Sequence, residues 1–183
     1  NYQLNYSPEN EIIITVGASQ AIDITLRTII QPGDEVLLPG PVYPGYEPLI
    51  KLAGGTPVYV DTREHNFKFT ADLIQQYITP KTKCVILPYP SNPTGVTLSK
   101  NELLADEIYS ELTYEEDHFS IGSFDEVRKQ TFIVQGVSKS HSMTGFRIGF
   151  LMGDSEVMKH VLKVHQYNVS CATSTSQYAA LEA

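Results

Sequence analysis

The residues with the clearest chemistry in this chain lie in one stretch, 136–149. It reads Gly-Val-Ser-Lys-Ser-His-Ser-Met-Thr-Gly-Phe-Arg-Ile-Gly, so Lys139 follows an apolar run and stands among small hydroxyl residues. A lysine used for imine chemistry needs a half-buried position, where its amine can lose a proton and attack a carbonyl group. Arg147 follows eight residues later, and its guanidinium group can bind a phosphate through paired hydrogen bonds. This stretch predicts a lysine nucleophile beside an anion-binding arginine.

Two turns elsewhere have residues that suit ligand binding. Around Gly17 the sequence Thr-Val-Gly-Ala-Ser-Gln-Ala passes from a predicted strand into a predicted helix. The free N–H groups and the dipole of a helix start favour a phosphate, although many such turns are plain connections. The sequence Ser-Asn-Pro-Thr-Gly follows another predicted strand and places Asn92 at the carboxyl edge of the sheet, where ligands of open α/β sheets bind. Taken alone, it is more simply a proline-glycine turn.

The segment Ala-Asp-Glu-Ile-Tyr holds a carboxylate, Asp106, and a phenol, Tyr109, three residues apart. With this spacing both side chains can reach one ring-shaped ligand. A surface acid beside a packed tyrosine explains the same residues equally well, so this segment alone does not decide between the two interpretations.

These residues require elements that bring them together, and the chain predicts such elements. Short apolar runs alternate with helical stretches, which is the pattern of a doubly wound α/β fold. We expect strands at 11–16, 35–38, 56–60, 83–87, 132–135 and 147–152, and helices at 19–30, 45–52, 70–77 and 155–167. The predicted class is α/β, with a mostly parallel central sheet and helices on both faces, in one domain over residues 1–183.

One junction does not fit this pattern. Ser99 and Glu102 form a capping box, which predicts a helix start. Only Leu103 and Leu104 follow before Ala105 begins the next motif, so a helix of usual length and a following strand are missing. We therefore expect that a segment has been lost between about residues 104 and 105. An intact mass equal to that of the printed sequence would contradict this hypothesis.

Composition excludes several functional classes. The formal net charge of −8 argues against a nucleic-acid partner, because phosphate backbones are bound by clustered Lys and Arg. No apolar run approaches the length of a bilayer span, so we expect no membrane partner. The N-terminus has no basic-then-apolar leader, which weakly favours a cytoplasmic location. Cys84 and Cys171 form no metal or redox motif, and we expect no metal site.

The four motifs together resemble the class I/II aminotransferases, which are fold-type I pyridoxal-phosphate enzymes. The resemblance runs from about Glu11 to the end of the chain and rests on Asn-Pro-Thr-Gly, Asp-Glu-Ile-Tyr, and Ser-Lys followed by Gly-Phe-Arg-Ile-Gly. It implies the large, cofactor-binding domain of such an enzyme, in partial form. It also implies that the smaller second domain and an N-terminal segment are absent, and that the whole protein is a homodimer.

The resemblance also assigns roles to residues of this chain. Lys139 is the implied catalytic residue, which forms the Schiff base with the cofactor and then moves a proton. The implied contacts to the cofactor ring come from Tyr43 by stacking, Asp106 at the pyridinium nitrogen, and Asn92 and Tyr109 at the phenolic oxygen. The implied phosphate contacts come from Gly17, Ala18, Ser19, Ser138 and Arg147.

The activity implied is transamination between an amino acid and a 2-oxo acid. Relatives of this type act on aspartate, aromatic amino acids or N-acetylated diaminopimelate, and nothing in these residues ranks those substrates. One alternative is a carbon–sulfur β-lyase on the same scaffold, but such relatives usually have a histidine where Tyr109 stands and lack the arginine at Arg147. Another alternative is the aminotransferase-like, ligand-sensing domain of a transcriptional regulator. Such regulators carry a winged-helix domain upstream, so the residues before Asn1 would distinguish this alternative.

Overall fold

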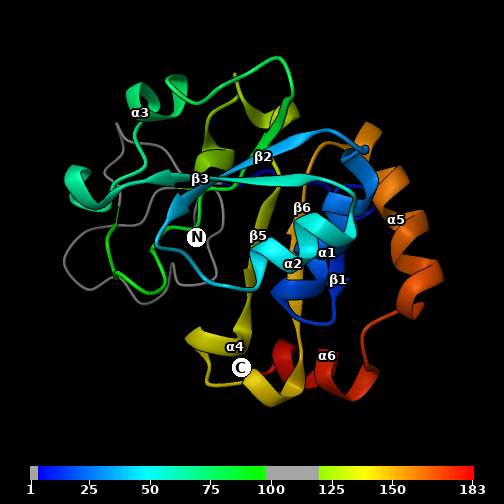
Figure 1. Ribbon diagram of the computed structural model, residues 1–183. Coiled ribbons are helices and arrows are strands. Elements are labelled where there is room, and N and C mark those ends of the chain that lie inside the picture. The colour runs from blue at the N-terminus through cyan, green and yellow to red at the C-terminus, as the bar shows by residue number, and fades with distance from the viewer. Residues whose placement is uncertain (1–3, 98–119) are drawn as a thin grey trace.

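The computed structural model describes residues 4–97 and 120–183, and it has an α/β architecture (Figure 1). The strands are β1 (Ile12–Thr15), β2 (Glu35–Gly40), β3 (Thr56–Asp61), β4 (Thr82–Val85), β5 (Ile133–Gly136) and β6 (Gly149–Met152). The α-helices are α1 (Ala18–Ile29), α2 (Tyr46–Leu52), α3 (Ala71–Gln75), α4 (Val137–Ser140), α5 (Ser155–Val169) and α6 (Ser174–Leu181). Short 3-10 turns are η1 (Arg63–His65), η3 (Ile121–Ser123), η4 (Arg128–Gln130) and η5 (Thr144–Phe146).

The described strands form two sheets of three strands. One sheet has the order β3-β2-β4 and is parallel throughout. The other has the order β1-β6-β5, and both of its pairings are antiparallel. The predicted α/β class with a parallel sheet is confirmed, and the feature that the prediction did not include is the antiparallel direction of β6. Its physical cause is the short connection between β5 and β6, which holds only α4 and η5 and turns the chain back instead of crossing over the sheet.

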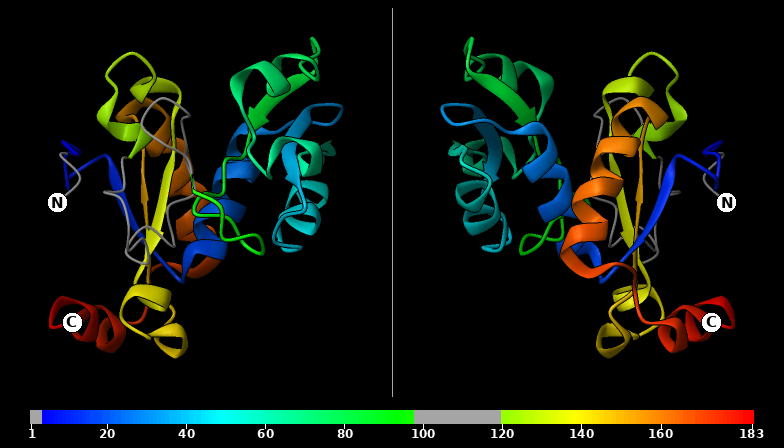
Figure 2. Two further views of the ribbon diagram at one scale, coloured as in Figure 1. Left: turned by 90° about the vertical axis from the view of Figure 1, so that its left-hand side faces the viewer. Right: turned by 90° about the vertical axis from the view of Figure 1, so that its right-hand side faces the viewer.

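Helix α1 lies between the two sheets (Figure 2), because it has apolar residues on two sides. Ala21 and Ile24 pack into a core with strands of the antiparallel sheet and with α5. Leu26 and Ile30 pack into a second core with β2 and α2. Burial of apolar surface stabilises a fold by roughly 25 cal/mol per Å². Because α1 buries apolar side chains in both cores, its position depends on both sheets.

The faces of β2 show how helices cover the parallel sheet. Val36 and Leu38 point into the core that holds α1 and α2, while Leu37 points into a core that includes Leu73 of α3. This alternation is the period of a strand that is buried on both faces. Within the described residues, no helix combines the length and the apolar character that a bilayer crossing requires.

Most predicted elements agree with the structure to within one or two residues at each end. The strand predicted at 147–152 starts two residues too early, because β6 begins only at Gly149. Arg147 has φ 56° and ψ 52°, a left-handed conformation that no strand residue adopts. The predicted junction between residues 104 and 105 lies outside the described residues.

Candidate active site

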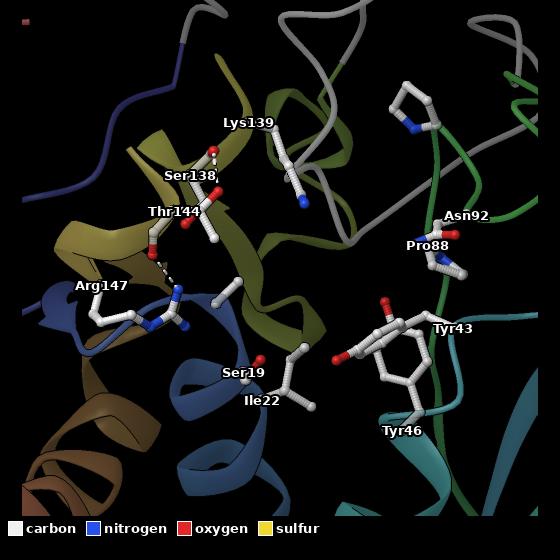
Figure 3. Close-up of a pocket in the computed structure, with 12 residues that line it drawn as sticks. Ser19, Ile22, Tyr43, Tyr46, Pro88, Asn92, Ser138, Lys139, Thr144 and Arg147 are labelled. Atoms are coloured by element: carbon white, nitrogen blue, oxygen red, sulfur yellow. Dashed lines mark hydrogen bonds between the residues drawn. The ribbon is translucent and has the colours of Figure 1, made fainter. Parts of the chain in front are cut away.

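A cavity of about 250 Å³ lies where several connections of the two sheets meet (Figure 3). The connections after β1, β2, β4 and β5 contribute to it, together with the residues before β6. Because β6 runs antiparallel to β1 and β5, its N-terminal end lies at the edge where those strands end; Gly149 is paired with both Thr15 and Gly136. The lining residues are Ala18, Ser19, Ile22, Tyr43, Tyr46, Pro88, Pro90, Asn92, Ser138, Lys139, Thr144 and Arg147.

One end of the cavity is built around the turn from β1 to α1. Gly17 precedes the helix with φ 77° and ψ 166°, a conformation that is essentially restricted to glycine. No side chain among the described residues caps this helix start. A Cβ atom on Gly17 would lie 2.3 Å from Nη2 of Arg147, so the missing side chain lets the guanidinium group lie against the turn. A positive helix end and a guanidinium group therefore face the same space, which suits an anion.

Side-chain hydrogen bonds hold this turn in place. The backbone N–H of Val16 donates to Oε1 of Gln20 over 2.6 Å, and the Thr15 hydroxyl donates to the Gly17 carbonyl over 3.1 Å. Thr15 itself is fully buried. The turn is therefore fixed before any ligand arrives, which reduces the entropy cost of binding.

The lysine and the arginine are linked through Thr144. The Thr144 hydroxyl donates to the Ser138 carbonyl over 2.9 Å, and the Thr144 carbonyl accepts a hydrogen bond from Nη1 of Arg147 over 2.8 Å. Figure 3 shows both hydrogen bonds on one side of the cavity. Ser138 and the side chain of Arg147 are therefore held in fixed positions relative to each other.

Lys139 extends from α4, directly after β5, and its side chain points into the open space of the cavity (Figure 3). The sequence predicted a half-buried lysine, but the residue is exposed. The reason is that its side chain enters an open cavity, while its neighbours Val137 and Ser138 are buried. The buried neighbours thus hold the backbone at Lys139, while its side chain is exposed in the cavity.

The opposite end of the cavity is aromatic. Tyr43, which is 42% exposed, follows β2, and its ring lies 5.7 Å from that of Tyr46 at an interplanar angle of 89°. Asn92 and Pro88 lie on the same side, on the connection after β4 (Figure 3). A flat aromatic side chain with an exposed face suits a planar ligand.

The described residues around this cavity are cationic rather than acidic. Its described lining residues include two cationic side chains, Lys139 and Arg147, and no carboxylate, although the chain carries a net charge of −8. Clustered cations in a partly enclosed site attract anionic ligands. Among the described residues, no group of three or more His, Cys, Asp or Glu side chains could hold a metal ion.

Most residues predicted from sequence meet in this cavity. Seven of them line it, namely Ala18, Ser19, Tyr43, Asn92, Ser138, Lys139 and Arg147. Gly17 adjoins it through Arg147. Asp106 and Tyr109 lie outside the described residues. Sequence reasoning missed Thr144, although it lies inside the lysine motif, and gave no site role to Tyr46.

A second cavity, of about 490 Å³, is larger but contains none of the predicted site residues. Side chains of α1, β4, β5 and the residues before β5 line it, most of them apolar. Cys84 is one of these residues, and burial raises the pKa of its thiol to about 11. Size alone therefore does not identify the site; the convergent polar groups of the smaller cavity do.

Comparison with known proteins gives a consistent result. The model of the family aminotransferase class I and II matches residues 1–183. A probable N-acetyl-LL-diaminopimelate aminotransferase of Bacillus subtilis is 62% identical over 193 residues, which cover 98% of this chain and 49% of the relative. An aspartate aminotransferase of Bacillus sp. is 43% identical over 198 residues, covering 99% of this chain and 50% of the relative.

Solved structures agree with these relatives. The aromatic aminotransferase from Pyrococcus horikoshii superposes with a TM-score of 0.92 at 36% identity, covering 98% of this chain and 52% of that chain. An aspartate aminotransferase from Thermus thermophilus gives a TM-score of 0.90 at 35% identity, covering 98% of this chain and 50% of that one. The chain spans about half the length of the curated relatives it matches.

Proposed function

The chain belongs to the class I and II aminotransferases, and from that premise we propose that the protein containing it moves an amino group from an amino acid to a 2-oxo acid by means of pyridoxal phosphate. The observation that carries this proposal is the Lys139 side chain, which points into the same cavity as the guanidinium group of Arg147 and the ring of Tyr43. An amine, an anion site and an aromatic surface match the aldehyde, the phosphate and the ring of this cofactor.

The cavity fits pyridoxal phosphate in size and in chemistry. Small-molecule sites typically measure about 300–1000 Å³, so a cavity of about 250 Å³ suits a compact ligand with one ring. Gly17 leaves the space beside Arg147 that a side chain would fill, and both cations of the lining favour a phosphorylated ligand. When bound, pyridoxal phosphate supplies a carbonyl group that condenses with amines and a ring that withdraws electrons.

The phosphate end is assigned to the β1–α1 turn and its partners. The backbone N–H groups of Ala18 and Ser19, together with the Ser19 hydroxyl, would donate hydrogen bonds to the phosphate. Gly17, whose own N–H donates to the Thr15 carbonyl, would contribute the open space of its backbone. Ser138 and Arg147 would complete this set. Charge-assisted hydrogen bonds of this kind are stronger than neutral ones, which is why a helix start paired with arginine binds phosphate well.

The ring end is assigned to Tyr43 and Asn92. Tyr43 would stack on the ring with its exposed face, and the Asn92 amide would donate a hydrogen bond to the phenolic oxygen. The roles of Asp106 at the pyridinium nitrogen and of Tyr109 at the phenolic oxygen remain predictions from the family resemblance.

Lys139 is the proposed catalytic residue. Its Nζ atom would first hold the cofactor and be released when the amino acid arrives. It would then accept the proton from the substrate α-carbon and donate it again later in the cycle, as a general acid and base. The long, exposed side chain can reach both positions, while the buried Ser138 keeps its backbone in place.

We further propose that residues 1–183 are part of the large cofactor-binding domain of a cytoplasmic homodimer, with a segment lost between about residues 104 and 105. One observation supports the lost segment. The alignment with the Bacillus subtilis relative runs over 193 residues, more than the 183 residues of this chain, so that relative has residues without a counterpart here.

The first test is reduction of the intact gene product with borohydride in the presence of pyridoxal phosphate, followed by peptide mass mapping. We expect one phosphopyridoxyl adduct, on Lys139, and none after Lys139→Ala. The control is Lys129→Ala, which removes an exposed lysine that does not line the cavity and should leave the adduct intact. An adduct spread over surface lysines would refute the assignment.

The second test measures the reaction itself. The intact gene product would be given aspartate, an aromatic amino acid or N-acetyl-LL-diaminopimelate as amino donor with a 2-oxo acid acceptor, and in a parallel reaction an amino acid with a sulfur atom on its β-carbon. Transamination yields a new amino acid, whereas a β-lyase releases ammonia and a free thiol from a sulfur-containing substrate. Release of ammonia without amino transfer would favour the β-lyase alternative.

A further inference from the structure

The ring of Tyr43 is held by residues of the turn that follows it. The following turn closes with a hydrogen bond from the Tyr46 N–H to the Tyr43 carbonyl over 3.4 Å. A Cβ atom on Gly45 would lie 2.2 Å from Cε1 of the Tyr43 ring, 2.7 Å from Cζ and 2.9 Å from the hydroxyl oxygen. The ring therefore rests against the backbone at Gly45, in space that any other residue would occupy.

The backbone conformation gives no other reason for a glycine there. Gly45 has φ −70° and ψ −19°, which are ordinary right-handed helical values that any residue can adopt. The three atoms nearest to a Cβ atom at this position all belong to Tyr43, so the requirement for glycine comes from the Tyr43 ring. A larger residue at 45 would have to displace the ring, because the backbone of a helix start cannot retreat from it.

Tyr46 supports the same ring from the side. Its ring meets that of Tyr43 edge to face, with centroids 5.7 Å apart and planes at 89°. Tyr46 is only 3% exposed and packs in the core with Val36, Leu38 and Ile50, so it cannot move freely. The exposed Tyr43 ring is thereby in contact with a residue of the buried core beside the parallel sheet.

We propose that Gly45 and Tyr46 are positioning residues that hold the Tyr43 ring as a fixed stacking surface for the aromatic ring of the ligand; this inference rests on the proposed function. A tyrosine that is exposed on one face would otherwise exchange between rotamers, and binding would have to select one of them. Fixing the ring beforehand lowers that cost and increases the affinity for a planar ligand.

The test uses the intact gene product and two ligands measured by calorimetry. Pyridoxamine phosphate has both a ring and a phosphate and forms no bond with a lysine, whereas inorganic phosphate reports on the anion end alone. We expect Tyr46→Leu and Gly45→Ala to lower the affinity for pyridoxamine phosphate roughly 3- to 10-fold, which is the size of effect that the loss of an edge-to-face aromatic contact produces. Tyr46→Phe should bind it as the wild type does, and inorganic phosphate should bind equally to all variants.

Three results would overturn the inference. The first is that Tyr46→Leu and Gly45→Ala both bind pyridoxamine phosphate with wild-type affinity. The second is that Tyr46→Phe binds it as weakly as Tyr46→Leu does. The third is that the variants lose affinity for inorganic phosphate by the same factor as for pyridoxamine phosphate. If Tyr46→Leu does not fold, Gly45→Ala decides alone, since that change adds one methyl group at the surface of the turn. In a Tyr43→Leu background, Gly45→Ala should have no further effect on pyridoxamine phosphate.

The same measurements separate this inference from the proposed function. A wild-type protein that binds pyridoxamine phosphate no better than inorganic phosphate would contradict the proposed function. A wild-type protein that prefers pyridoxamine phosphate, with variants that bind it equally well, would contradict only the role of Gly45 and Tyr46.

Discussion

Gly149→Ala should damage the anion end of the cavity through one methyl group. Gly149 begins β6 and is buried, and a Cβ atom on it would lie 2.6 Å from the carbonyl carbon of Gly17, 2.7 Å from the backbone nitrogen of Ala18 and 2.9 Å from Oγ1 of Thr15. Ordinary contacts begin near 3.4 Å, so β6 and the turn would have to separate by about 0.8 Å. Two of these neighbours are backbone atoms, which no rotamer change can move away.

The expected loss of stability follows from that separation. Overpacking of a tight contact costs about 1–3 kcal/mol, and a domain of this size loses roughly 2–4 °C in Tm per kcal/mol. The affinity for inorganic phosphate should fall about tenfold or more, because the N–H groups of the turn and the Arg147 guanidinium no longer reach one anion together.

The assay is a pair of measurements on the same variants: Tm by calorimetric scan and phosphate affinity by titration. The matched control is Gly145→Ala, in the segment that leads to β6, where a Cβ atom would meet nothing within 4 Å. It should leave Tm and phosphate affinity unchanged. A Gly149→Ala variant with wild-type Tm and wild-type phosphate affinity would refute the reasoning from close backbone approach.

Three further predictions concern other parts of the structure. Thr144→Val removes the hydroxyl that links the lysine turn to the arginine segment, so phosphate affinity should fall severalfold by titration, whereas Thr144→Ser should preserve it. At pH 8 a thiol reagent should modify the exposed Cys171 quickly and Cys84 hardly at all, because burial raises the pKa of Cys84 to about 11. Modification of both cysteines at the same rate, followed by mass spectrometry, would contradict this. The hydrogen bond from Arg128 lowers the pKa of Glu11, so this pair stabilises the fold fully above pH 4.5, the ordinary carboxyl pKa, and loses the effect as pH falls through the lowered pKa. In Glu11→Gln the free energy of unfolding should therefore fall less steeply between neutral and acid pH than in the wild type. An equally steep fall in both proteins would count against the pair.

The sequence was sufficient where chemistry depends on residue type and local order. The lysine motif, the glycine turn before α1 and the asparagine turn were each recognisable from a short stretch, and the structure brings Ser19, Asn92, Lys139 and Arg147 to one cavity. The helices and strands were also predictable, because each has an apolar period that matches its geometry.

The sequence was insufficient where long-range contacts decide. Nothing local shows that β6 runs antiparallel to β1, since an apolar run has no direction. Nothing local shows the left-handed backbone of Arg147, which the surrounding contacts impose and which shortens the predicted strand. Nothing local shows the edge contact of Tyr46 with Tyr43, which depends on a turn geometry that spacing alone does not define.

The double packing of α1 has a thermodynamic consequence. Its residues Ile24 and Leu26 belong to different cores, and the same helix begins at the proposed phosphate site. Separation of the two sheets would therefore disturb the helix and the anion site together. A ligand that binds only the assembled site opposes this separation by mass action. Amide hydrogen exchange in both sheets should then slow together when phosphate is added, so that two local opening reactions become one cooperative unit.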